Sequence, residues 1–311
     1  MITSFFKTSK PIHYIIFSIV LTALFCYQRI FDGKFESNFL NYLNESLYLL
    51  VLIASLFTVI FIVTKNNLTH NNSFAALFFC LFFGVFPQSL EYTSTLIANF
   101  FILLSLRRII SLKNKTNIKK KVLDATLWIC LATLFNSFSI FFLAALFIGI
   151  VLYSVLEIKN LLIPFFGLLA FAILWVFFDL VVHDQLLNIS EYLPVVNFEA
   201  RKSIFQKNLL FSLFIGAFLL FGVVNYFLAN ASKNRFNRPS ILLLILIIII
   251  TSFIFFLFSQ SESKEGYIFL VAPSAILMAN ACETSKFSWA TDLMILALFI
   301  VAVLQIPFNI S

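Results

Sequence analysis

Charge is scarce in this sequence. Charged side chains make up 11% of the 311 residues, whereas soluble domains carry about 25%. Hydrophobic residues make up 61% of the chain, and the mean hydropathy is +1.02. A soluble fold cannot bury so many apolar side chains, but a bilayer accepts them as protein surface. The composition therefore excludes a mainly soluble protein and predicts an integral membrane protein.

Cysteine, histidine and glycine are also few. The four cysteines show no CxxC spacing and the three histidines form no HxxxH pair. A disulfide framework, a zinc site and a His-ligated iron site are therefore not expected. The sequence also lacks a P-loop, a GxSxG elbow and an HExxH motif, which removes several enzyme classes. With seven glycines and no internal repeat, the pattern is not typical of transporters.

Apolar runs separated by polar breaks predict α-helices that cross a membrane, each of which needs about 20 apolar residues. We predict an all-α fold, a polytopic transmembrane helix bundle that forms one integral membrane domain over residues 1–311. A polar break at 136–139 also allows a re-entrant hairpin. The eleven expected spans are 13–30, 46–64, 74–88, 93–111, 122–136, 138–157, 161–183, 208–229, 240–258, 267–282 and 288–308.

The basic residues in the connections predict the orientation. With a cytoplasmic N-terminus, 15 of the 21 Lys and Arg lie inside, seven of them within residues 107–121. We therefore expect a multi-pass protein of the bacterial inner membrane with its C-terminus outside. The same orientation places 10 of the 14 acids outside, so we expect the function at the outer face. The basic run lacks aromatic interleaving, so anionic lipid and not nucleic acid is its expected partner.

Four acidic residues are candidates for chemistry. Asp179 lies in an apolar run and is a candidate for substrate binding, with snorkelling to the interface as the alternative. Asp32, Glu36 and Glu91 lie in outer connections and could act as general bases or hold a divalent cation. The alternative for these three is that they are solvated loop acids. No metal site is assigned.

One part of the chain resembles a known fold. In the stretch 83–108, Pro87 and Glu91 precede an apolar run that ends in Arg107 and Arg108. This resembles the third-to-fourth helix hairpin of GT-C-type glycosyltransferases, which use polyprenyl-phosphate-linked sugars. The stretch 121–137 resembles the short hairpin that follows in those enzymes. The resemblance covers roughly residues 74–180 and implies a GT-C-like core.

The GT-C resemblance also implies roles for individual residues. Asp32 or Glu36 would be the catalytic base, and Glu91 would assist or bind a metal. Arg201 or Lys202 would bind the lipid phosphate. The chain departs from the GT-C pattern because its first outer connection is short, the usual Asp-Glu pair is absent and no large outer domain follows.

The whole chain also resembles an uncharacterised multi-pass family of Bacteroidetes, through segments 4–11 and 65–73. That family implies no activity, so whether the protein is an enzyme stays open. Our leading hypothesis is a GT-C-like membrane glycosyltransferase or lipid-linked-substrate protein, with membrane lipid and a polyprenyl-phosphate-linked substrate as partners. The first alternative is a non-catalytic subunit of an envelope assembly for secretion, motility or polysaccharide export, with protein partners. The second alternative is a transporter.

Overall fold

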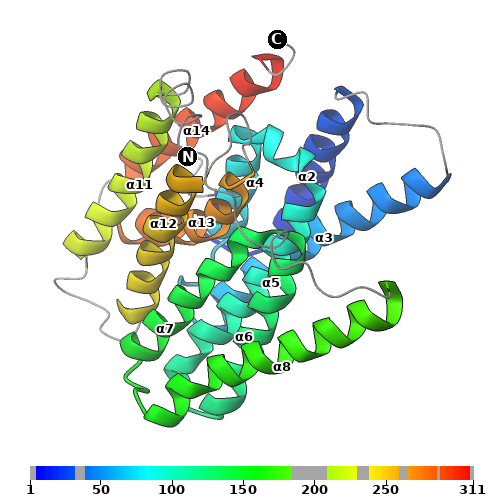
Figure 1. Cartoon of the computed structure of the whole chain (residues 1–311). Coiled ribbons are helices and arrows are strands. Elements are labelled where there is room, and N and C mark those ends of the chain that lie inside the picture. The colour runs from blue at the N-terminus through cyan, green and yellow to red at the C-terminus, as the bar shows by residue number, and fades with distance from the viewer. Residues whose placement is uncertain are drawn as a thin grey trace. The chain divides into compact units, whose positions relative to one another are not determined.

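A computed structural model describes residues 5–31, 39–183, 209–229, 238–258, 265–285 and 288–308. Within these ranges the fold is all-α (Figure 1), as predicted. The α-helices are α2 (Pro11–Phe31), α3 (Phe39–Lys65), α4 (Phe74–Val85), α5 (Thr93–Ile110), α6 (Ile118–Phe135), α7 (Phe142–Leu152), α8 (Ile158–His183), α11 (Leu209–Ala229), α12 (Arg238–Phe258), α13 (Tyr267–Thr284) and α14 (Ser288–Phe308). Short 3-10 helices are η1 (Pro87–Glu91), η2 (Ser111–Asn114) and η3 (Ser137–Phe141).

Each of the eleven predicted spans coincides with one of these helices. The largest boundary difference is at α3, which begins at Phe39 and not at residue 46. Its first turns contain Asn41, Asn44 and Glu45, so a hydropathy threshold misses them. Residues 138–141, predicted to begin a span, form part of η3 before α7 begins.

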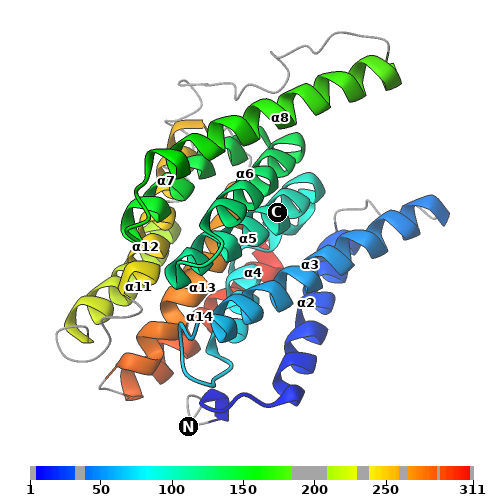
Figure 2. The same ribbon diagram turned by 90° about the horizontal axis from the view of Figure 1, so that it is seen from below.

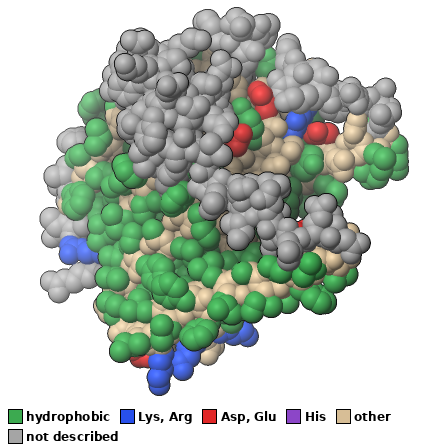
Figure 3. All heavy atoms as spheres, in the orientation of Figure 1, with side chains coloured by type: hydrophobic (Ala, Val, Ile, Leu, Met, Phe, Trp, Pro, Cys, Tyr) green, Lys and Arg blue, Asp and Glu red, His purple; other side chains and the backbone are tan. Residues whose placement is uncertain are grey.

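Five helical segments are long and apolar enough to cross a membrane, namely α2, α3, α5 with η2, α8 and α13. Five further apolar stretches, in α4, η3–α7, α11, α12 and α14, are shorter within the described side chains. Figure 3 shows hydrophobic side chains over much of the surface that the structure describes. The long apolar helices are compatible with a membrane protein, while the number of crossings stays a prediction.

The exposed face of α8 illustrates this compatibility. Phe165, Phe166 and Phe177 are each more than half exposed along this helix. Water would penalise such a surface at roughly 25 cal/mol for each Å² of apolar area. Lipid does not, so this exposed surface is compatible with contact to acyl chains.

The helices group into two compact units, one of residues 1–96 and 197–311, the other of residues 97–196. In the first unit, all twelve residues of α4 are buried, and α4 packs against α2, α3, α13 and α14. A Cβ added to Gly84 would lie 3.0 Å from that of Ala302 in α14. Small residues at such contacts let helices approach closely in lipid. Whether the two units act as the single predicted domain stays a prediction.

Side-chain contacts of the first unit gather at two opposite ends. At one of them, the last turn of α2 contacts η1 and the first turns of α3. There the first turn of α5 also contacts the residue that precedes α13 by two positions, Glu265. At the other, the α3–α4 connection meets the start of α2 and the end of α13. We call the first the Glu91 end, made of Gln28, Arg29, Glu45, Glu91, Thr95 and Glu265. We call the second the Glu283 end, made of residues 66–73 with Asn280 and Glu283.

In the second unit, α6 packs against α7 and α8 (Figure 2). Asn136 ends α6, and its side chain accepts a hydrogen bond from the backbone N–H of Phe138 at 3.0 Å. Arg108 Nη2 and Asp124 Oδ2 form an ion pair at 3.0 Å between α5 and α6. The polar break predicted at 136–139 is therefore a capped turn between two helices.

Candidate functional site

The connection between α4 and α5 positions Glu91. Pro87 lacks a backbone N–H and disfavours helical geometry at Phe86, so α4 ends at Val85. Glu91 is the last residue of η1, and its Oε1 accepts a hydrogen bond from Nε2 of Gln28 at 2.7 Å. Gln28 is only 2% exposed. The buried amide therefore fixes the position of the carboxylate.

Glu265 is a second carboxylate at this end, just before α13. Its Oε2 accepts a long hydrogen bond of 3.4 Å from the hydroxyl of Thr95. Tyr267 stacks on Phe86 with 4.5 Å between ring centroids, which fixes the start of α13 against the end of α4. Burial raises the pKa of Glu265, and the Thr95 hydrogen bond lowers it in part. This carboxyl therefore holds a proton more readily than an ordinary glutamate.

Arg29 and Glu45 form a largely buried pair between α2 and α3. Nε of Arg29 lies 3.0 Å from Oε2 of Glu45, and the arginine side chain is 4% exposed. The ring of Phe25 lies 5.3 Å from the guanidinium carbon. Nε and Nη2 of Arg29 and Oε2 of Glu45 are buried without a hydrogen-bond partner among the described residues. The pair is therefore in charge contact without hydrogen-bond geometry, and a buried unpaired donor costs about 1–3 kcal/mol.

The structure describes two of the predicted site residues. Glu91 lies at the Glu91 end of the first unit. Asp179 lies in the last turns of α8 in the second unit and is partly buried. The remaining four predicted residues fall outside the described residues, so their roles stay predictions, as does a site shared with Glu91. These four are Asp32, Glu36, Arg201 and Lys202.

The sequence interpretation missed five residues of the Glu91 end as site candidates. Arg29, Glu45 and Glu265 were counted only among the residues of the outer side, and Gln28 and Thr95 were not singled out. A signal was present, because Gln28 and Arg29 are adjacent polar residues inside the apolar run predicted at 13–30. Polar residues within a membrane span are functional candidates by default.

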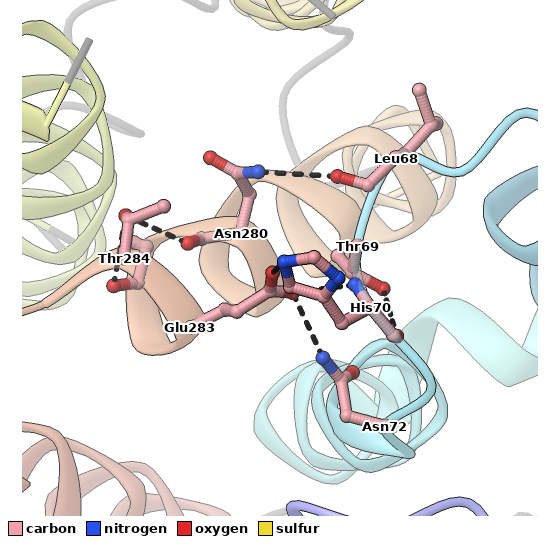
Figure 4. Close-up of polar contacts among 8 residues, drawn as sticks. Leu68, Thr69, His70, Asn72, Asn280, Glu283 and Thr284 are labelled. Carbon is pink, nitrogen blue, oxygen red and sulfur yellow. Dashed lines mark hydrogen bonds and ion pairs between the residues drawn. The ribbon is translucent and has the colours of Figure 1, made fainter. Parts of the chain in front are cut away.

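The Glu283 end is differently built (Figure 4). Oε2 of Glu283 accepts hydrogen bonds from the backbone N–H of His70 at 2.8 Å and from Nδ2 of Asn72 at 2.9 Å. Its Oε1 lies 3.2 Å from Nε2 of His70. One turn earlier, Asn280 donates a hydrogen bond to the carbonyl of Leu68 at 3.2 Å. Both carboxylate oxygens have partners, so this end is a structural joint between α13 and the α3–α4 connection.

The chemistry available at the Glu91 end follows from these groups. A fixed carboxylate such as Glu91 can accept a proton from a substrate hydroxyl. The guanidinium of Arg29 can bind an anion through paired N–H groups. Within the described ranges, no three His, Cys, Asp or Glu side chains are grouped as ligands for a metal ion.

Comparison with known proteins gives a family but no activity. No curated protein and no solved structure matches the chain. A family model described as a family of unknown function, DUF6427, matches residues 9–310. The match covers nearly the whole chain, so the chain belongs to the DUF6427 family.

Proposed function

We propose that the protein is a GT-C-like membrane glycosyltransferase, or a protein that binds a lipid-linked substrate, acting at the Glu91 end. The observation that carries the proposal is Glu91, a carboxylate that the sequence singles out and that the buried amide of Gln28 holds at 2.7 Å. A general base must be held within hydrogen-bond reach of the proton that it removes. Glu91 would take that proton from an acceptor hydroxyl.

The distribution of charge supports an outer location for this end. Among the described residues of the first unit, the Glu91 end carries three glutamates and one basic residue, Arg29. Lys65 ends α3 at the Glu283 end, and the backbone N–H of Ser9, next to Lys10, bonds to Asn71 there. Basic residues favour the cytoplasmic side. We therefore propose that the Glu283 end and the N-terminus face the cytoplasm of a bacterial inner membrane.

Exposed apolar side chains support a lipid-linked substrate. Tyr42, Leu43 and Leu47 are exposed on α3 on either side of Glu45. In a bilayer these side chains would contact the hydrocarbon chain of a polyprenyl phosphate while its head group reaches the polar residues. A water-soluble substrate would gain little from contact with such an apolar surface.

A non-catalytic subunit of an envelope assembly is the second candidate. The broad exposed apolar face of α8 favours it, because a helix of a partner protein would cover this face as well as lipid does. A transporter ranks third. Its substrate path needs polar groups inside the bundle, whereas the central helix α4 consists of apolar residues, one cysteine and one glycine.

The test is Glu91→Gln, which keeps the shape of the side chain and removes the base. We expect loss of the cellular function at unchanged protein abundance, because removing a base lowers the rate about 100- to 10,000-fold. Glu157→Gln, at an exposed position before α8, is the matched control and should behave as the native protein.

Lipid analysis of the purified protein provides the second measurement. We expect a polyprenyl phosphate, free or sugar-linked, to copurify with the native chain. Normal function of the Glu91→Gln variant, together with a stable protein partner and no such lipid, would refute the transferase and leave the assembly subunit as the better proposal.

A further inference from the structure

Arg29 lies at the end of a candidate membrane span. Arg29 is in the last turn of α2 and of the candidate membrane span Pro11–Ile30. The ends of a transmembrane helix lie at the level of the lipid head groups. The neighbouring Ile30 is 61% exposed, so an apolar surface suited to lipid adjoins the buried charge.

Two donors on one edge of this guanidinium have no hydrogen-bond partner among the described residues. Nε and Nη2 lie side by side on the planar group, and both are buried without a hydrogen-bond partner in the described part of the chain. Two parallel N–H groups match two oxygens of one phosphate or carboxylate group. The unpaired atoms therefore form a complete two-donor fork for an anion.

Glu45 does not fill this fork. Its Oε2 lies 3.0 Å from Nε, yet neither atom takes part in a hydrogen bond within the described residues. The carboxylate balances the charge of the guanidinium without satisfying its donors. The ring of Phe25 also lies 5.3 Å from the guanidinium carbon. The guanidinium is therefore in contact with a carboxylate and an aromatic ring while two of its donors have no hydrogen-bond partner among the described residues.

We infer that the Nε–Nη2 edge of Arg29 binds a phosphate group, and that this phosphate belongs to a membrane lipid. The position at the end of a candidate span favours phosphate over carboxylate, since lipid phosphates are abundant at that depth. The exposed Ile30, Tyr42 and Leu43 would contact the hydrocarbon chain. Free phosphate has the same chemistry and is the other source to be distinguished. The inference stands on the Arg29 geometry and does not depend on a transfer reaction.

The experiment measures binding to the purified full-length protein by native mass spectrometry. The probes are a short-chain phosphatidic acid, inorganic phosphate and a diacylglycerol of the same chain length that lacks phosphate. Arg29→Gln should weaken phosphatidic acid binding about 10- to 100-fold, as expected for loss of charged hydrogen bonds. Glu45→Gln should bind as tightly or more tightly, because it removes a negative charge beside the phosphate.

Controls separate binding from folding and lipid from free phosphate. Glu157→Gln, at an exposed position before α8, is the control and should leave binding unchanged. Arg29→Lys keeps the charge with a single donor group and should bind with intermediate affinity. A loss confined to phosphatidic acid identifies a lipid head group, and an equal loss for inorganic phosphate identifies the free ion.

Two outcomes would overturn the inference. In the first, Arg29→Gln binds all three probes as the native chain does. In the second, Arg29→Gln and Glu45→Gln lower the unfolding temperature equally and neither changes the affinity for phosphatidic acid. Arg29 and Glu45 would then be only an internal ion pair. Glu91→Gln should retain binding of phosphatidic acid. Failure of the transferase proposal can therefore be distinguished from failure of the Arg29 inference.

Discussion

The two ends of the first unit differ in how their carboxylates are hydrogen-bonded. At the Glu283 end, both oxygens of a single glutamate have partners from the α3–α4 connection. At the Glu91 end, Arg29 and Glu45 keep buried atoms without a hydrogen-bond partner among the described residues. Nearly all buried polar groups in proteins are hydrogen-bonded, and exceptions require a reason. The contacts of the Glu283 end stabilise the fold, and we propose that the Glu91 end binds a ligand.

The physical origin of the difference lies in the connections. The backbone N–H of His70 in the α3–α4 connection needs an acceptor, and Glu283 supplies it. The α4–α5 connection instead uses its own η1 turn, in which the hydroxyl of Ser89 donates to the carbonyl of Phe86 at 2.6 Å. The glutamate at the end of that turn accepts a hydrogen bond from the side chain of Gln28, which lies in α2.

The largest stability effect should come from Glu283→Ala. The change leaves the donors of His70 and Asn72 without their acceptor, so the free energy of unfolding should fall by about 3 kcal/mol. Thermal and denaturant unfolding in detergent would measure it. Thr284→Val is the control, because that hydroxyl bonds only to carbonyls of its own helix. Unchanged unfolding of Glu283→Ala would show that the Glu283 end is not a joint.

A pair of matched amide replacements should separate the two ends. Asn72→Leu removes a donor to Glu283 and should lower the free energy of unfolding by about 1–2 kcal/mol. Any loss of cellular function should then follow only from a lower amount of folded protein. Gln28→Met removes the donor to Glu91 and should lower the cellular function about tenfold at near-normal abundance, because the carboxylate is no longer held in place. If both variants lose stability and function in parallel, the distinction between the ends is wrong.

The smallest effect should be the pH dependence at Glu265. Burial raises the pKa of this carboxyl in the folded state above its unfolded value of about 4.3. The folded state therefore binds more protons, and stability falls as pH rises through the folded pKa. Glu265→Gln should raise the unfolding temperature slightly at neutral pH, and the gain should vanish toward pH 4. A gain that is constant with pH would contradict this, and Glu157→Gln should show none.

The helices could be predicted from the sequence because their cause is local. A chain segment in lipid must satisfy its own backbone hydrogen bonds, so each apolar run becomes a helix. The start of α3 escaped prediction because Asn41, Asn44 and Glu45 interrupt its hydropathy. The end of α4 could be predicted in principle, since Pro87 restricts the residue before it.

Glu91 could be predicted as a candidate, but its partners could not. The sequence shows an acid after a proline at a predicted outer connection. This pattern predicts Glu91 as a candidate but says nothing about which side chains contact it. That Gln28, 63 residues away, donates to it depends on how α2 packs beside η1. The same holds for Thr95 and Glu265, which are 170 residues apart.

By itself the sequence determined that this protein is helical, apolar enough for a bilayer and divided between acidic and basic connections. Each of these properties is carried by single residues or short windows, so no contact has to be known. Only the tertiary structure decided which carboxylates are structural and which lie beside unsatisfied donors. The reason is that hydrogen bonding depends on distances of about 3 Å and on direction, and helix packing sets both.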